Sequence, residues 1–292
     1  MCVPLLPSLS PLPLLLSSQH PDTPREPSPS NNSGLGAGLS ARALAQHGIN
    51  LTLVEIDPAV YEFARDYFGV GEDVDAGEVV LDDAVRWVER QEAQGGKLFD
   101  YIIHDVFTGG AVPSTLFTLP FLTRLASLLH PSGILALNFA GTLSSASSRS
   151  ILRTVLHAFT SSPSTSGHCR AIEDVPQTAT GAQRPAGPDA FRNLVVFCSR
   201  EGSVPLEFRA PHAGDYLAWP SPGIRRSVFA SFRGQEVDLG GVAVAGEGPE
   251  GGGGLIRGEE DARRVAREQV AEVRMHWAAM REVLPREVWA RW

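Results

Sequence analysis

The sequence predicts an α/β fold built on a doubly wound, mostly parallel, Rossmann-like sheet, and three observations indicate it. A glycine-rich run at residues 34–38 is followed by a short helical segment and then by an apolar strand at 50–57 that ends in acidic side chains. Segments with helical periodicity alternate with further apolar strands, which is the order that right-handed crossovers require. The strand at 98–105 is apolar on both faces, as expected of a central parallel strand.

The other elements follow from local patterns. Pro58 suits a first helical position after Asp57 as the cap, and apolar residues at helical spacing extend this helix to residue 68. Pro120 falls inside a helix expected at 114–129, where we expect it to cause a kink. The further expected elements are helices at 84–94 and 150–159 and strands at 78–81, 134–139, 170–173 and 193–198.

Composition and charge restrict the class of protein. The chain has 292 residues, of which 43% are hydrophobic and 20% charged, which suits a globular protein of one large or two small domains. The net charge of -8 argues against a nucleic-acid-binding surface. Cys2, Cys169 and Cys198 show no metal-binding or redox spacing, so we expect reduced cysteines and a cytoplasmic protein.

The first 33 residues differ from the rest of the chain. They are rich in Pro, Ser and Leu, and prolines interrupt the apolar part, so we expect disorder, no membrane span and no signal peptide. A strand should lead directly into Gly34, yet residues 27–33 contain no apolar run. We therefore expect the first strand of the sheet to be missing, and our hypothesis is a truncated or mis-spliced version of a longer protein.

The glycine run and the acid after the next strand predict a nucleotide-type ligand. Gly34, Gly36 and Gly38 allow the backbone to approach a ligand closely, and Glu55 is placed to accept hydrogen bonds from two ribose hydroxyls. Leu39 occupies the place of the third glycine of the dinucleotide motif, which favours an adenosyl-sulfonium ligand over a dinucleotide. The alternative is a glycine-rich loop that binds nothing.

Two further acids follow apolar strands. Asp83 would lie beside an adenine amino group at the carboxyl end of its strand, although it would serve equally as the N-cap of the next helix. Asp105 would orient or deprotonate an amine, and the alternative is that it braces the following loop. His104 precedes it and should point in a different direction, so we expect it to be packed in the protein.

These motifs, in order, resemble those of the spermidine synthase family, and the resemblance extends to fungal spermine/spermidine synthase-like proteins in the tail. The motifs are residues 34–38, 54–57, 82–84 and 99–105, followed by a Pro- and Leu-containing stretch at 112–133. The resemblance implies the class I adenosylmethionine-dependent transferase fold for residues 34–200. Residues 201–258 would be a loop-rich extension with a glycine-rich linker, and residues 259–292 a C-terminal helix and tail.

The family resemblance also implies a reaction. That reaction is aminopropyl transfer from decarboxylated S-adenosylmethionine to a small amine or polyamine, without a metal, and the enzyme is a candidate homodimer. Asp105 would act on the attacking amine. The residues that would hold S-adenosylmethionine or its decarboxylated form are Gly34, Gly36, Gly38, Glu55, Ile56, Asp83 and Ala84.

Three departures from the family keep other functions open. Ala37 stands where synthases carry an Asp for the donor amine, the loop after Asp105 has no second acid, and we expect the N-terminal hairpin domain to be absent. A methyltransferase of the same fold is therefore an alternative, which Ala37 favours because an Asp would repel the carboxylate of full adenosylmethionine. A catalytically inactive binding or scaffold protein is another alternative, and an NAD-dependent oxidoreductase is a weak one.

Overall fold

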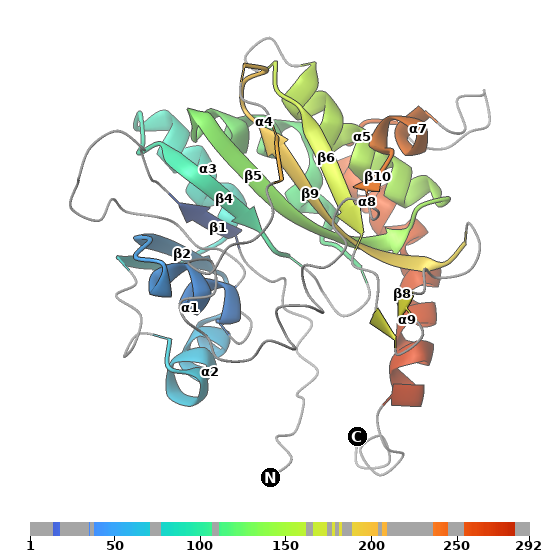
Figure 1. Ribbon diagram of the computed structural model, residues 1–292, viewed down its shortest axis with the longest axis horizontal. Coiled ribbons are helices and arrows are strands. Elements are labelled where there is room, and N and C mark those ends of the chain that lie inside the picture. The colour runs from blue at the N-terminus through green and yellow to red at the C-terminus, as the bar shows by residue number, and fades with distance from the viewer. Residues whose placement is uncertain are drawn as a thin grey trace.

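The computed structural model describes residues 14–17, 35, 38–70, 77–106, 111–161, 166–173, 177–178, 181–182, 189–203, 206–208, 236–244 and 254–283. Their centre is an eight-stranded sheet with the order β10-β6-β9-β5-β4-β1-β2-β3 (Figure 1). The strands are β1 (Leu14–Ser17), β2 (Leu51–Glu55), β3 (Glu78–Leu81), β4 (Phe99–His104), β5 (Leu129–Thr142), β6 (Cys169–Glu173), β9 (Phe191–Ser199) and β10 (Glu236–Val237). A separate pair consists of β7 (Gln177–Thr178) and β8 (Gly181–Ala182).

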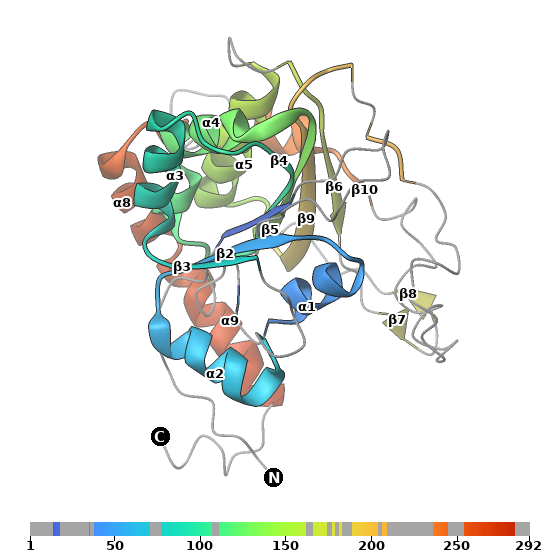
Figure 2. The same ribbon diagram turned by 90° about the vertical axis from the view of Figure 1, so that its left-hand side faces the viewer.

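Helices cover both faces of the sheet (Figure 2). One face carries α3, α4, α5 and α8, and the other carries α1 and α2 beside β2. The helical elements are α1 (Leu39–Gln46), α2 (Pro58–Phe68), α3 (Ala84–Ala93), η1 (Ser114–Phe117), α4 (Leu119–Ser127), α5 (Ala146–Thr160), α7 (Leu239–Val244), α8 (Glu259–Glu268) and α9 (Val270–Val283). The doubly wound α/β fold predicted from the sequence is thus confirmed.

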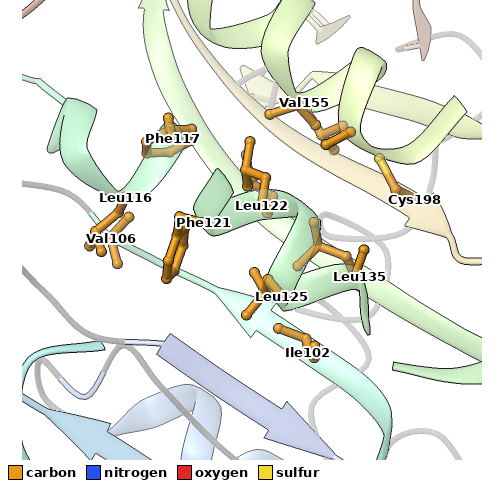
Figure 3. Close-up of a cluster of buried hydrophobic side chains, with 14 of the residues drawn as sticks. Ile102, Val106, Leu116, Phe117, Phe121, Leu122, Leu125, Leu135, Val155 and Cys198 are labelled. Atoms are coloured by element: carbon orange, nitrogen blue, oxygen red, sulfur yellow. The ribbon is translucent and has the colours of Figure 1, made fainter. Parts of the chain in front are cut away.

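The larger hydrophobic core lies between the sheet and helices α3, α4, α5 and α8. Side chains from β4, η1, α4, β5 and α5 meet there, with Phe117, Phe121 and Leu122 fully buried at its centre (Figure 3). A smaller core beneath α1 and α2 includes Leu51 and Leu53 of β2. Alternate residues of β2 therefore enter different cores, as the period of two in a strand requires.

The sheet is mixed, and its centre differs from the expectation. Strands β2 to β6 point the same way, whereas β1, β9 and β10 run in the opposite direction. The expected gap at the first strand is filled by Leu14–Ser17, which pairs antiparallel with both β2 and β4. The expectation of a missing strand and of disorder is wrong for these four residues, because their backbone groups pair with two strands that would otherwise expose unpaired edges.

Three further expectations need correction. Pro120 is the second residue of α4 rather than a kink inside a longer helix, because η1 ends at Phe117 and α4 begins at Leu119. The single C-terminal helix expected within residues 259–292 is two helices, since Gln269 separates α8 from α9. The end of the expected flexible linker is held in place, because Ile256 is buried and its N–H donates to Thr154 Oγ1 at 3.0 Å.

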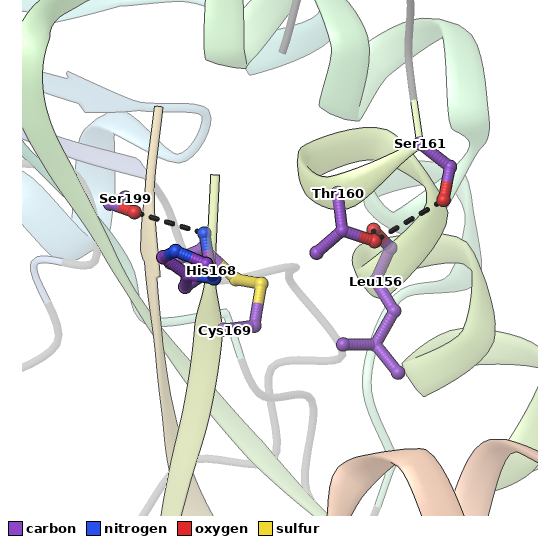
Figure 4. The surroundings of a disulfide bond; sticks show 7 residues. Leu156, Thr160, Ser161, His168, Cys169 and Ser199 are labelled. Carbon is purple, nitrogen blue, oxygen red and sulfur yellow. Dashed lines mark hydrogen bonds between the residues drawn. A yellow bond between two sulfur atoms is a disulfide. The ribbon is translucent and has the colours of Figure 1, made fainter. Parts of the chain in front are cut away.

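The cysteines also differ from the expectation. Cys169 of β6 and Cys198 of β9 are cross-strand partners joined by a disulfide, with a Cα–Cα distance of 4.1 Å (Figure 4). The sequence separation of 29 residues conceals this pairing, because it depends on the register of two strands. Cys198 is fully buried, so the disulfide fastens the β6–β9 pair from within the larger core.

Candidate active site

The register of β1 brings two of the predicted site residues to the same edge of the sheet. Leu15 pairs with Leu53 of β2 on one side and with Ile103 of β4 on the other. Glu55 lies two residues after Leu53, and Asp105 lies two residues after Ile103. The two acids therefore reach the same level on the same face of the sheet, and they are two strands apart. Two strand spacings correspond to about 10 Å. This is the carboxyl edge of the parallel strands, where α/β folds bind their ligands.

Glu55 is a buried acid that its surroundings satisfy only in part. Its side chain is 1% exposed, and Oε1 accepts a hydrogen bond from the Asp57 N–H at 2.8 Å. Oε2 is buried without a hydrogen-bond partner among the described residues. Loss of solvent on burial is the main cause that raises the pKa of Glu55 from 4.5 to about 7, against the lowering effect of the Asp57 N–H.

This environment fits the ribose of an adenosyl ligand. A buried carboxylate oxygen without a partner is costly, and hydroxyl donors remove that cost. Ile56 follows directly and is a large apolar side chain with 38% exposure, a surface suited to a nucleoside. The residues present at the end of β2 therefore fit the predicted adenosyl group.

At the end of β3, Asp83 is the N-cap of α3. Its Oδ1 accepts from the N–H groups of Val85 at 2.8 Å and Arg86 at 3.1 Å, which is the alternative role considered for it. Asp82 donates its N–H to the Glu55 carbonyl at 2.9 Å, which ties this turn to the end of β2. Ala84 is 7% exposed and packs in the larger core, so its side chain offers little surface to a ligand.

Of the three glycines, the structure describes only Gly38; Gly34 and Gly36 lie outside the described residues. Gly38 is the N-cap of α1 with φ 72°, a conformation that side chains other than glycine rarely adopt. A Cβ there would lie 2.1 Å from Val70 Cγ2. Gly38 is therefore required by the packing of α1 against the turn after α2.

Asp105 is held by a residue that the sequence did not single out. Asn138 of β5 donates from Nδ2 to Asp105 Oδ1 at 2.9 Å, and both side chains are half-buried. The signal available in the sequence was a polar residue inside an otherwise apolar strand. His104, in contrast, is fully buried with Nε2 3.0 Å from the Leu116 carbonyl, and burial lowers its pKa to about 4. The expectation that His104 is packed is confirmed.

The described ranges contain no group of three or more His, Cys, Asp or Glu side chains arranged to hold a metal ion. None of the described helices is long and apolar enough to cross a membrane.

Comparison with known proteins supports the motifs. The sequence profile of the spermine/spermidine synthase domain matches residues 34–164. An N-terminal histidine N-methyltransferase of Emericella nidulans is 36% identical over 263 residues, which is 89% of this chain and 43% of that protein. A polyamine aminopropyltransferase of Vibrio vulnificus is 36% identical over 107 residues, which is 36% of this chain and 35% of that protein.

The chain spans less than half the length of these two curated relatives. Among solved structures, a probable spermidine synthase from Corynebacterium glutamicum aligns with a TM-score of 0.49 and 20% identity, covering 77% of this chain and 70% of that one. The matched residues 34–164 contain Glu55, Asp83 and Asp105 and the strands that carry them. The resemblance to the spermidine synthase family is thus confirmed for residues 34–164, which contribute their strands to a doubly wound α/β sheet.

Proposed function

We propose that the protein is an adenosylmethionine-dependent methyltransferase that modifies a nitrogen atom, with a peptide that begins with histidine as the first acceptor to test. The observation that carries this proposal is the extent of the similarity to the histidine N-methyltransferase, which reaches well beyond residue 164 and takes in most of the chain. The similarity to the aminopropyltransferase covers about a third of it. Ala37 supports the same choice, because an Asp at this position would repel the carboxylate of full adenosylmethionine and an alanine does not.

The donor side of the site would depend on Glu55. When bound, adenosylmethionine supplies an electrophilic methyl group on a sulfonium. Glu55 Oε2 would accept hydroxyl hydrogen bonds from the ribose, and Ile56 would cover an apolar part of the nucleoside. The glycine run would bring the backbone close to the rest of the donor.

The acceptor side would depend on Asp105. A nitrogen nucleophile must present a lone pair, and a carboxylate that accepts its N–H both orients that lone pair and takes up the proton. Asn138 donates a hydrogen bond to Oδ1 of Asp105 and so restrains the plane of the carboxylate. Oδ2 would then accept from the acceptor nitrogen, at the level of Glu55 and about 10 Å from it by strand spacing.

Aminopropyl transfer to an amine is the second candidate. The match of residues 34–164 to the synthase domain and the aminopropyltransferase similarity favour it. Aminopropyl transfer requires the same nucleoside site, and its attacking amine must likewise be oriented and lose a proton. Glu55 and Asp105 would therefore keep their roles.

Product analysis separates the two reactions. The purified protein is incubated with adenosylmethionine and a histidine peptide, and with decarboxylated adenosylmethionine and a diamine. Adenosylhomocysteine and a peptide mass increase of one methyl group would support methyl transfer. Methylthioadenosine formed only with the diamine would instead establish aminopropyl transfer, and no product with either pair would favour a non-catalytic binding protein.

Asp105→Asn tests the acceptor side. We expect it to keep donor affinity within about twofold and to lower kcat by a factor of about 10² to 10⁴, the range for loss of a general base. Asp66→Asn, on the exposed face of α2, is the control and should leave both quantities unchanged. Normal turnover by Asp105→Asn would show that Asp105 only braces the structure.

A further inference from the structure

Glu272 is a buried acid that the C-terminal helix brings to the end of β5. It lies in the first turn of α9, which continues beyond the edge of the sheet at which β5 ends (Figures 1 and 2). The side chain is 4% exposed, and Oε1 accepts a hydrogen bond from Ser147 Oγ at 3.0 Å. Ser147 belongs to the first turn of α5, so two segments 125 residues apart meet at this carboxylate.

Gly141 makes room for this carboxylate. A Cβ added at Gly141 would lie 3.2 Å from Glu272 Oε2 and 2.8 Å from Ser148 Oγ, so the acid rests against β5 where no side chain intervenes. Gly141 is three residues beyond Asn138, which corresponds to about 10 Å along the strand. Residues three apart face opposite sides of a strand. Glu272 therefore lies on one side of the end of β5, and the Asp105–Asn138 pair lies on the other side.

The charge of Glu272 is not balanced by the described part of the chain. The nearest strand offers Arg192, the cross-strand partner of Gly141, but its guanidinium donates to both oxygens of Glu173 at 3.1 and 3.2 Å. No cationic side chain of the described ranges forms an ion pair with Glu272.

We propose that Glu272 binds a positively charged group of the acceptor, separate from the nitrogen that is modified. A buried carboxylate with one hydroxyl donor lacks a cation, and an ammonium supplies both the charge and the missing donors. The inference rests on the proposed function: a peptide that begins with histidine carries an α-ammonium in addition to its imidazole, so the free chain terminus is the recognised group.

The test compares Glu272→Gln with Glu268→Gln and the wild type. Glu272→Gln keeps an oxygen for the Ser147 hydroxyl and loses the charge, and Glu268, exposed on α8 and paired with Arg264, is the matched control. Calorimetry measures the Kd of a histidine peptide, and of the same peptide with an acetylated terminus, for the protein saturated with adenosylhomocysteine. Methylation of both peptides is assayed by mass spectrometry in the same samples.

We expect Glu272→Gln to weaken binding of the free-amine peptide at least tenfold and to leave the acetylated peptide unchanged, with Glu268→Gln like the wild type. Equal effects on both peptides, or no effect, would overturn the inference and leave Glu272 as a structural contact of α5. Absence of peptide binding by the wild type would also overturn it. Binding with the expected discrimination but without methylation would refute the proposed function alone.

Discussion

Two glutamates occupy equivalent places in the sheet and have different surroundings. Glu55 is the last residue of β2 and Glu173 the last residue of β6, and each is 1% exposed. Arg192 donates to both carboxylate oxygens of Glu173. Glu55 has the Asp57 N–H on one oxygen, and Oε2 has no hydrogen-bond partner among the described residues.

The difference separates an acid that supports the fold from one that we propose is available to a ligand. A buried carboxylate that is paired internally already has its hydrogen bonds and its counter-charge, so Glu173 does not require a small molecule to supply them. Burial without a cation raises the pKa of Glu55 to about 7, so near neutral pH the folded protein carries a carboxylate that is costly to ionise. Perturbation of this kind is concentrated at functional sites.

The largest expected effect is on Glu173. Glu173→Gln removes the charge that balances Arg192 and should lower the free energy of unfolding by about 4 kcal/mol, the cost of breaking a buried pair. Urea unfolding measures this loss. Donor affinity of the folded fraction should stay unchanged, and a loss of affinity without a loss of stability would remove the distinction between the two acids.

Glu55→Gln should change the free energy of unfolding in the opposite direction. The raised pKa of Glu55 means that the folded state holds this proton more tightly than the unfolded chain does. The stability that the protonated Glu55 contributes to the folded state is therefore fully present below about pH 4.5, and it is lost as the pH rises through about 7. At pH 8 the variant should be more stable than the wild type by up to about 3 kcal/mol, and at pH 4 the difference should vanish. Thermal unfolding at both pH values measures this, and a variant less stable at pH 8 would contradict it.

Donor binding should depend on the ionisation of Glu55. Hydroxyl donors favour the carboxylate, so ligand binding lowers the pKa of Glu55 and releases a proton. Below about pH 7 the affinity for methylthioadenosine should fall by about tenfold for each pH unit. Methylthioadenosine is the suitable probe because it lacks the α-amino group of adenosylmethionine, which titrates near this range.

The variant Glu55→Gln is the control for this pH series. It should bind methylthioadenosine about 100-fold more weakly at pH 8, consistent with the loss of one to two hydrogen bonds to a charged group. Its affinity should be independent of pH between 5 and 8. A wild-type affinity that is equally independent of pH would show that the ligand does not contact Glu55.

Local signals predicted the part of the site that depends on neighbouring residues. The apolar run of β2, the cap at Asp57 and Pro58 at the start of α2 were all recognisable, because each depends on a few adjacent residues. Long-range pairing was not recognisable. The antiparallel β1, the Cys169–Cys198 disulfide and the Asn138–Asp105 hydrogen bond each depend on strand register.

The smallest expected effect concerns Asp83, a third acid that follows a strand. Asp83→Ala removes the cap of α3 and should lower the free energy of unfolding by about 1 kcal/mol. Asp83→Asn keeps an oxygen for the Val85 and Arg86 N–H groups, so it should leave the stability near that of the wild type. If Asp83 Oδ2 also accepts from the adenine amino group, the asparagine variant should still bind methylthioadenosine several-fold more weakly, since an amide nitrogen replaces that acceptor. Unchanged affinity would make Asp83, like Glu173, an acid that serves the fold alone.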